Sequence, residues 1–219
     1  MSQQPTLIIT GGSSTIAQHI GQYWKKHHTD WLTLVVNRSV LDVTDTNAVQ
    51  EYFSNHKCDL LVCAAGISDN SLLRQTSATA FEKSLQVNLH AAANCAVAAA
   101  KRMAKQMSGH ILFLSSYSAY HPPSGQVAYA TSKGALLGLT QDFAKEWGPY
   151  NIRVNTILPG WIDSPMTQIV SEKRRSQVLA EHTLKRWNTS ENVAAFVSHL
   201  HHYLVNTSGQ IFNLDSRII

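Results

Sequence analysis

Short runs of consecutive apolar residues alternate with longer stretches of helical periodicity along this chain, and this alternation restricts the fold more than any other feature. The first run, Leu7–Thr10, is apolar at successive positions, which is typical of a strand buried on both faces of a parallel sheet. After it, Ile16, Ile20 and Trp24 recur at helical spacing. Strands that alternate with helices indicate βαβ units, so we expect an α/β protein with a doubly wound parallel sheet and helices on both faces. The other expected strands are Leu32–Val36, Asp59–Cys63, Ile111–Leu114, Ile152–Ile157 and Gln210–Leu214, and the other expected helices are Thr46–Asn55, Phe81–Met107 with Gly109 as its C-cap, and Tyr129–Trp147.

The length and the charge of the chain restrict its organisation and its partners. A chain of 219 residues suits one α/β domain, since such domains reach about 200 to 250 residues. We therefore predict a single domain over residues 1–219. The net charge of +4 is small, and the basic residues are scattered apart from Lys173–Arg175, which predicts no nucleic-acid partner. Charged residues make up only 15%, which favours a surface that is partly covered in an oligomer.

The cysteines and the N-terminal residues indicate the compartment, and the histidines bear on metal binding. The three cysteines, Cys58, Cys63 and Cys95, show no paired spacing, which suits a reducing compartment. The first residues lack the layout of a signal peptide, and no apolar run approaches the length of about 18 residues that marks a membrane span. The pairs His27-His28 and His201-His202 have no further ligand at diagnostic spacing, so we interpret them as helix-surface histidines and predict no metal. These features predict a cytoplasmic protein without a membrane partner.

A glycine-rich turn follows the first expected strand and begins a helix. The segment reads Thr10-Gly11-Gly12-Ser13-Ser14-Thr15-Ile16-Ala17. At such a junction, backbone N–H groups and the N-terminus of the helix can face a pyrophosphate. A plain strand-to-helix loop is the alternative, because Gly-Gly-Ser is also ordinary turn chemistry.

Tyr129 and Lys133 lie four residues apart in an expected helix and therefore share one of its faces. A nearby ammonium group favours the phenolate form, so we expect Lys133 to lower the pKa of Tyr129. Ser115-Ser116 closes the strand Ile111–Leu114 at its carboxyl end, where ligands of α/β sheets bind. A hydroxyl there can hold a carbonyl oxygen for Tyr129 to protonate. The Tyr–Lys pair alone is weak evidence, and its setting is what gives it weight.

Together these segments resemble the short-chain dehydrogenase/reductase family, and the resemblance runs from Leu7 to Asp215. The order and spacing of Ser116, Tyr129 and Lys133 match the catalytic residues of that family, and Asn88 stands at the place of its fourth active-site residue. The resemblance implies a Rossmann-like fold. It implies that Tyr129 is the general acid or base and that Lys133 lowers the pKa of Tyr129 and holds the ribose. It also implies that Ser116 hydrogen-bonds the substrate oxygen and that Asn88 anchors a water that relays protons.

The same resemblance implies a binding site for a nicotinamide dinucleotide, built from segments that are spread along the chain. Pro159-Gly160 matches the segment that contacts nicotinamide, and Leu41–Asp45 matches the stretch that meets adenine. No acid follows the second expected strand until Asp42, whereas Arg38 is available for a 2′-phosphate, so we predict NADP(H) in preference to NAD(H). The predicted cofactor-binding residues are Gly11, Ser13, Ser14, Thr15, Ile16, Asn37, Arg38, Asp42, Val43, Ala65, Gly66, Tyr129, Lys133, Pro159, Gly160, Ile162 and Ser164.

Several positions depart from the pattern of the family. Thr15 and Ala17 replace two motif glycines, and Ala64 replaces an Asn that braces the central strands. The gap between Val36 and Asp59 holds one helix, whereas the family has a helix, a strand and another helix there. We interpret the chain as a shortened member that has either lost one crossover helix or reduced it to a turn at Asn37–Leu41.

The substrate is expected between the strand ends and a lid over residues 163–188. The predicted substrate contacts are Ser118, His121, Trp161 and Met166, with a solvated loop residue as the alternative for His121. Lys173–Arg175 is interpreted as a solvated helix face, with docking of an acidic carrier protein as the alternative.

These observations predict an oxidoreductase that transfers hydride between a nicotinamide cofactor and a small-molecule carbonyl or alcohol substrate. A dinucleotide-binding sensor without turnover is the alternative on the same fold. The alanine-rich helix through Ala91–Ala100 and the helix of Tyr129 are expected to form a homodimer or homotetramer, because small side chains let a partner helix approach closely and the family uses these two helices.

Overall fold

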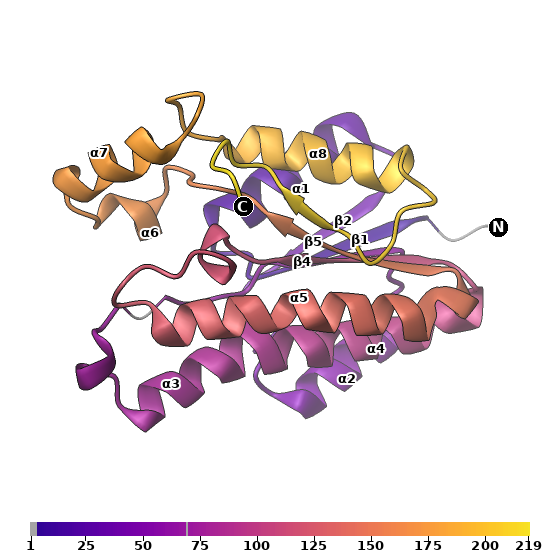
Figure 1. Ribbon diagram of the computed structural model, residues 1–219. Coiled ribbons are helices and arrows are strands. Elements are labelled where there is room, and N and C mark those ends of the chain that lie inside the picture. The colour runs from indigo at the N-terminus through magenta and orange to yellow at the C-terminus, as the bar shows by residue number, and fades with distance from the viewer. Residues whose placement is uncertain (1–3, 69) are drawn as a thin grey trace.

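The computed structural model describes residues 4–68 and 70–219, and its centre is a parallel sheet (Figure 1). The described residues form six strands in the spatial order β2-β1-β3-β4-β5-β6, with every neighbouring pair parallel. The order reverses between β1 and β3, which creates the switch point where α/β sheets bind ligands. The strands are β1 (Thr6–Thr10), β2 (Leu32–Val36), β3 (Leu60–Cys63), β4 (Gly109–Leu114), β5 (Ile152–Leu158) and β6 (Ile211–Asn213).

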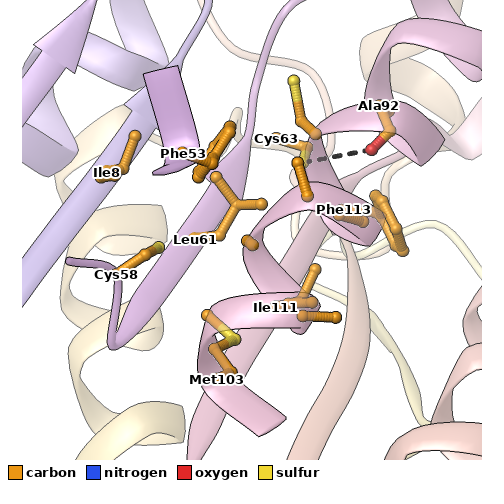
Figure 2. Close-up of a cluster of buried hydrophobic side chains, with 14 of the residues drawn as sticks. Ile8, Phe53, Cys58, Leu61, Cys63, Ala92, Met103, Ile111 and Phe113 are labelled. Atoms are coloured by element: carbon orange, nitrogen blue, oxygen red, sulfur yellow. Dashed lines mark hydrogen bonds between the residues drawn. The ribbon is translucent and has the colours of Figure 1, made fainter. Parts of the chain in front are cut away.

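Helices cover both faces of the sheet, as predicted (Figure 1). On one face lie α1 (Thr15–His27) and α8 (Ser190–His202), and on the other lie α2 (Thr46–Asn55), α4 (Ala91–Gln106) and α5 (Val127–Trp147). Successive strand residues supply the two layers in turn: Leu7 and Ile9 pack beneath α1 and α8, whereas Ile8 packs on the opposite side. Figure 2 shows the layer beneath α2 and α4, where Phe53 and Met103 meet the strand side chains. Both faces are buried, which explains why the strands are apolar without alternation.

The long helix expected over Phe81–Met107 is present as three successive helical segments. These are α3 (Ala78–Leu85), a π-helical turn η2 (Gln86–His90) and α4. The expected cap at Gly109 is wrong, because Met107 takes the left-handed conformation with φ 52° and Gly109 already belongs to β4. Glycine is needed at position 109 for space, since a β-carbon there would lie 2.3 Å from Sδ of Met103.

The connection between β2 and β3 is short, as predicted. A turn at 37–41 leads directly toward α2, so the connection contains neither a further helix nor a strand among its residues, all of which the structure describes. The carbonyl oxygen of the Asn37 side chain accepts hydrogen bonds from the backbone N–H groups of Ser39 and Val40, which closes the turn. β2 therefore forms one edge of the sheet.

Several short elements were not predicted, namely η1 (Leu73–Gln75), η3 (Tyr117–Ala119), η4 (Gly148–Tyr150) and α6 (Pro165–Gln168). No bounds were predicted for α7 (Glu172–Glu181) and α8, but the interpretation of Lys173–Arg175 and His201-His202 as helix-surface residues implied helices there, and both helices are present. Within the part of the chain that the structure describes, no helix combines the length and apolar character needed to cross a bilayer.

The interpretation of His28, His201 and His202 as helix-surface residues is wrong. Their rings lie between α1 and α8, where His28 stacks on His202 at 4.4 Å and Trp24 stacks on His202 at 5.6 Å. Trp31 lies edge-on to His201 at 5.1 Å. The histidines fill the contact between the two helices because their rings pack like other aromatic side chains.

Candidate active site

A large cleft opens at the carboxyl ends of the strands, next to the switch point between β1 and β3. Its volume is about 1590 Å³. The segment 163–188, expected as a lid, contributes part of α6 and α7 to one side of it. All but two of the predicted site residues line this cleft: Gly11, Ser13, Ser14, Thr15, Ile16, Arg38, Asp42, Val43, Ala65, Gly66, Ser116, Ser118, His121, Tyr129, Lys133, Pro159, Gly160, Trp161, Ile162, Ser164 and Met166. The two that do not line it are Asn37 and Asn88.

The glycine turn places the N-terminus of α1 in the cleft. Gly11 has a φ of 72°, and a β-carbon on it would lie 2.4 Å from the backbone nitrogen of Ala65, so only glycine fits. The hydroxyl of Ser14 caps the helix by accepting a hydrogen bond from the N–H of Ala17 at 3.2 Å. The earlier N–H groups of a helix have no intrahelical partner, and Ser13, Ser14 and Thr15 line the cleft. This close approach of bare backbone to the ends of β1 and β3 fits a dinucleotide pyrophosphate.

Lys133 is buried beneath Tyr129 on α5. Its side chain enters the protein beside β4, where Nζ donates a hydrogen bond to the carbonyl oxygen of Leu114 at 2.8 Å. The residue is only 5% exposed, and burial lowers its pKa to about 8. Nζ lies 6.0 Å from the centre of the Tyr129 ring, so the two side chains share one face of the helix as predicted.

The expected lowering of the Tyr129 pKa is not found in this structure. Burial raises the pKa of the phenol above its ordinary value, and a hydrogen bond with Ser116 opposes that rise only in part. The ammonium group of Lys133 donates to the carbonyl oxygen of Leu114 and lies 6.0 Å from the centre of the Tyr129 ring, and its charge is not among the causes of the shift. Ser116 itself follows β4, and its oxygen accepts a hydrogen bond from the N–H of Ser118 at 3.1 Å.

Asn88 lies in the π-helical turn and is completely buried. Its side-chain oxygen accepts a hydrogen bond from the N–H of Ile67 at 2.8 Å, and its amide group donates to the carbonyl oxygen of Ile67 and to the Ser132 hydroxyl, each at 2.9 Å. Ser132 lies between Tyr129 and Lys133 on α5. Asn88 therefore joins the loop after β3 to the helix that carries both residues.

Arg38 and Asp42 form an ion pair at the end of the cleft beside β2. Nη2 of Arg38 lies 2.9 Å from Oδ2 of Asp42, and Nε of Arg38 donates to the same oxygen at 3.0 Å. Hydrogen bonds from Thr44 and the pair with Arg38 hold the pKa of Asp42 below its usual range. The Arg38 side chain is 83% exposed. Asn37 uses its side chain in the adjacent turn and contributes none of the cleft surface.

The opposite end of the cleft is bounded by the Pro159-Gly160 turn and the lid segment. Gly160 has a φ of 81° and packs against Asp215, where a β-carbon would lie 2.9 Å from the Asp215 Cβ. Trp161 stacks on Trp187 at 5.3 Å. Of the other predicted substrate contacts, the hydroxyl of Ser118 donates to the Gln126 side chain at 3.0 Å, the ring of His121 stacks on Tyr117 at 4.8 Å, and Met166 is 48% exposed.

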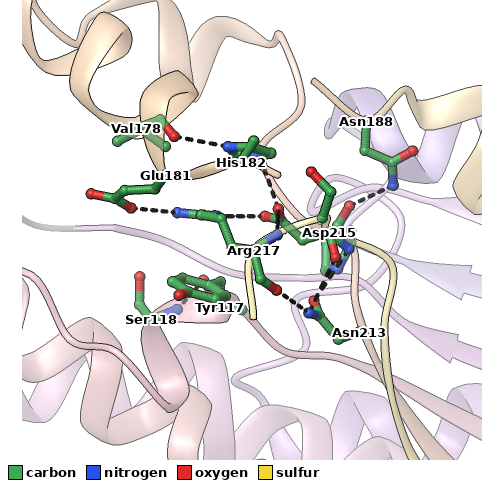
Figure 3. A network of polar contacts seen from close by, with 12 residues as sticks. Tyr117, Ser118, Val178, Glu181, His182, Asn188, Asn213, Asp215 and Arg217 are labelled. Carbon is green, nitrogen blue, oxygen red and sulfur yellow. Dashed lines mark hydrogen bonds and ion pairs between the residues drawn. The ribbon is translucent and has the colours of Figure 1, made fainter. Parts of the chain in front are cut away.

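Sequence reasoning missed a polar network that joins the lid segment to the C-terminal residues (Figure 3). Tyr117, Glu181 and Arg217 all line the cleft, and Asp215 lies buried behind them. The sequence carries no motif for this group, because its members come from η3, α7 and the residues after β6. The one signal in the sequence is that Asp215-Ser216-Arg217 lacks the Gly pair that is usual at this place in the family.

Comparison with known proteins defines the class to which this fold and site belong. Residues 15–216 match the family model described as enoyl-(acyl carrier protein) reductase. The 3-oxoacyl-[acyl-carrier-protein] reductase FabG of Thermotoga maritima is 32% identical over 190 residues, which cover 84% of this chain and 77% of the relative. The enzyme of the same name from Aquifex aeolicus is 32% identical over 198 residues, which cover 88% and 78%.

Two solved structures share the fold. The crystal structure of gox2181 superposes with a TM-score of 0.85 at 23% identity and covers 98% of this chain and 95% of its own. A structure assigned to an NAD(P)-dependent gluconate 5-dehydrogenase of Beutenbergia cavernae, with NADP bound at low occupancy, gives a TM-score of 0.87 at 23% identity, with 98% and 96% covered.

The fold is a Rossmann-like parallel sheet with a cleft at its switch point. The chain belongs to the short-chain dehydrogenase/reductase family of oxidoreductases, and the 3-oxoacyl reductases among its relatives support an enzyme that acts on CH–OH and C=O groups.

Proposed function

We propose that this protein is an NADP(H)-dependent reductase or dehydrogenase in which Tyr129 exchanges the proton of a carbonyl or alcohol substrate. The observation that supports this proposal most is the presence of Tyr129, Lys133 and Ser116 in the same cleft as the N-terminus of α1. Proton-transfer groups and a phosphate-binding helix end are both needed for such a reaction, and here they share one cavity.

The residues of the chain divide the work between binding and proton transfer. Ser13, Ser14, Thr15 and Ile16 would hold the pyrophosphate, and Pro159-Gly160 would contact the nicotinamide. When bound, the nicotinamide supplies or accepts the hydride at the carbonyl carbon.

Tyr129 donates its phenolic proton to the substrate oxygen during reduction and takes it back during oxidation. The high pKa of the buried phenol keeps it protonated, which suits the donor role. Ser116 holds the substrate oxygen beside it. Lys133, with its lowered pKa of about 8, returns the proton to Tyr129 when the Leu114 contact is exchanged for the ribose. Asn88 serves this relay by holding the loop after β3 against α5, in accordance with its contacts with Ile67 and Ser132.

The preference for NADP(H) is supported by Arg38, which lies at the cleft end next to β2. Its guanidinium group can pair with a 2′-phosphate and stack on adenine. Asp42 offsets part of this charge through the ion pair at 2.9 Å, so the preference is expected to be modest.

For the substrate, a 3-oxoacyl thioester is the first class to test, because the relatives from Thermotoga maritima and Aquifex aeolicus are named for such a reaction. The lid segment adds an apolar surface to the cleft with Met166, Ile169 and Val170. Its Arg174 and Arg175 are paired with Glu181 and Asp163 at 3.8 and 3.4 Å, which favours a solvated, internally paired helix face over a docking site for an acidic carrier protein.

The test is a reductase screen with both cofactors over 3-oxoacyl thioesters, quinones, pterins and sugars. The absorbance of the reduced nicotinamide measures the consumption of the cofactor. We expect NADPH consumption with at least one of these classes. Saturable NADPH binding without consumption on any class would instead support the dinucleotide-binding sensor.

A further inference from the structure

Arg217, the third residue from the C-terminus of the chain, is buried in the wall of the cleft at 8% exposure (Figure 3). Its guanidinium group donates to Oδ2 of Asp215 through Nε at 3.0 Å and through Nη2 at 2.5 Å. Nη1 lies 3.7 Å from the carboxylate of Glu181 at the end of α7. The plane of the group covers the ring of Tyr117, with Cζ 3.8 Å from the ring centre, which is the geometry of a cation–π contact.

Tyr117 is held by the C-terminal residues at both ends of its side chain. Arg217 covers the ring, and the phenolic hydroxyl donates a hydrogen bond to the carbonyl oxygen of Ile218 at 3.1 Å. Tyr117 directly follows Ser116 and begins the turn η3. Within this turn, the backbone N–H of Ser118 donates a hydrogen bond to the hydroxyl oxygen of Ser116. A shift of the Tyr117 side chain would therefore move the backbone that places this hydroxyl.

Asp215 fixes the position of Arg217 and connects it to the other walls of the cleft. Its side chain has no exposed surface, and its second oxygen, Oδ1, lies 2.8 Å from Nε2 of His182, the residue after α7. Its Cβ packs against Gly160 of the turn proposed to contact the nicotinamide. Burial opposes ionisation of Asp215, but the hydrogen bonds from Arg217 outweigh it and hold the pKa of the carboxyl below its usual value. Arg217 is thus paired with a carboxylate that is charged and fully buried.

We propose that Arg217 is a positioning residue of the reaction, because it sets the place of Ser116 through Tyr117 and joins the lid helix α7 to the same point. The proposal rests on the proposed function of the Ser116–Tyr129 site. The planar, forked guanidinium group is required, since it stacks on a ring and binds a carboxylate at once, whereas the ammonium group of lysine is a point charge.

The experiment compares Arg217→Lys and Arg217→Met with a matched control, Arg153→Met. Arg153 is likewise an arginine whose guanidinium group is held by hydrogen bonds, in its case to the carbonyl oxygens of Leu200, His201 and Leu204, but it lies at the amino ends of the strands, away from the cleft. Four quantities are measured for each variant: the Kd of NADPH, the kcat and KM for the carbonyl substrate, and the midpoint of urea unfolding.

We expect both Arg217 variants to bind NADPH within about threefold of the parent and to lose at least about tenfold in kcat/KM for the carbonyl, because a displacement of about 1 Å at a reacting group can cost about 10²-fold. Arg153→Met is expected to lower the unfolding midpoint and leave both kinetic constants unchanged. Arg217 variants with the parent's kcat/KM, or with an equal loss of NADPH affinity and substrate turnover, would overturn the proposal.

Two further measurements test the positioning role of Arg217 if Arg217→Met does not fold or if the proposed function is wrong. If Arg217→Met does not fold, Tyr117→Leu removes the stacked ring and leaves the Asp215–Arg217 pair, and the same loss in kcat/KM is expected. If the parent enzyme reduces no carbonyl, the proposed function fails, and hydrogen exchange decides the positioning role. Faster exchange at residues 115–120 in Arg217→Met, with unchanged exchange in α1, would support it, and unchanged exchange at 115–120 would reject it.

Discussion

At the scale of single residues, Tyr129 is a partly buried phenol that lies beside the hydroxyl of Ser116 and near Lys133, whose ammonium group donates its hydrogen bond elsewhere. Burial raises the pKa of Tyr129, and Lys133 donates to Leu114, so the phenol is held in its protonated form. A group in this form can act as an acid as soon as a carbonyl oxygen reaches it. Recruitment of Lys133 toward the phenol then requires only that its bond to one carbonyl group be exchanged.

The substitution Tyr129→Phe should retain the fold and the binding of NADPH but lower turnover by about 10²- to 10⁴-fold, because only the proton-carrying oxygen is removed. Steady-state kinetics on a substrate that the parent reduces well, together with NADPH titration, measure both quantities. Tyr150→Phe is the control, since Tyr150 is 46% exposed in η4 and does not line the cleft. Turnover of Tyr129→Phe within about threefold of the parent would contradict its role.

Arg38 and Asp42 should influence cofactor choice in opposite directions. Arg38→Ala is expected to raise the KM for NADPH about tenfold more than the KM for NADH, since a hydrogen bond to a charged group contributes about 1.5–3 kcal/mol. Asp42→Asn should raise the preference for NADPH, because it removes the carboxylate that lies 2.9 Å from Arg38.

The ratio of kcat/KM for NADPH and NADH measures this preference in each variant. An Arg38→Ala enzyme with an unchanged ratio would show that Arg38 is a plain surface residue. A parent enzyme that uses NADH at least as well as NADPH would refute the preference for NADP(H).

At the scale of elements, the contact between α1 and α8 contains three histidines, His28, His201 and His202, whose pKa values are lowered by burial. Burial lowers the pKa of His201 to about 3, with further lowering by His202, Arg153 and His28. The pKa of His110 is also well below its usual value because of burial, Arg153 and His201. Asp30 acts in the opposite direction on His28 and His202. The sheet and both helices thus pack around imidazoles that must stay uncharged.

This packing predicts loss of stability in acid. Between pH 6.5 and about 3 the unfolded chain binds a proton at residue 201 that the folded chain does not, so folded stability falls as the pH falls through this window. The contribution of one such group reaches up to about 1.4 kcal/mol per pH unit. Urea unfolding at pH 7 and pH 5 should therefore show a smaller acid loss in His201→Phe than in the parent. His199→Phe, on the exposed face of the same helix, should retain the loss of the parent. An equal acid loss in all three proteins would exclude His201 as its source.

At the scale of the whole molecule, most of the alanines that suggested an oligomer are already buried by contacts within one protomer. Ala91, Ala96, Ala98, Ala99 and Ala100 are at most 4% exposed, because α4 packs on the sheet and beside α2. Small side chains are nevertheless exposed on α5, at Thr131 and Ala135. The prediction of a dimer or tetramer therefore depends on α5 more than on the alanine content of α4.

Light scattering at micromolar protein should return a mass of at least twice the 24.2 kDa of the chain. Ala135→Arg should lower that mass, because a long charged side chain keeps a partner helix from approaching α5. Gln18→Arg, on the exposed face of α1, is the matched control and should retain the mass of the parent. A stable mass near 24.2 kDa for the parent would contradict the prediction.

The sequence by itself determined the class of fold and the location of the cleft. Consecutive apolar positions in Leu7–Thr10 and helical spacing after the glycine turn are local patterns, and parallel strands bring their carboxyl ends to one edge whatever the details of packing. The spacing of Ser116, Tyr129 and Lys133 is likewise written in one stretch of chain. For this reason, the amino-acid sequence alone was enough to assign these residues to one cleft.

The tertiary structure alone decided which effects dominate inside that cleft. The phenol of Tyr129 has a raised pKa because its burial outweighs the hydrogen bond with Ser116, and burial is a property of the packed molecule. Met107 rather than Gly109 ends the helix, because the strand β4 already begins at Gly109. Arg217 reaches Tyr117 from the far end of the chain, and the histidines of α8 meet those of α1 between the two helices. Contacts between such distant segments leave no periodic trace in the sequence, so they follow only from the folded arrangement of the chain.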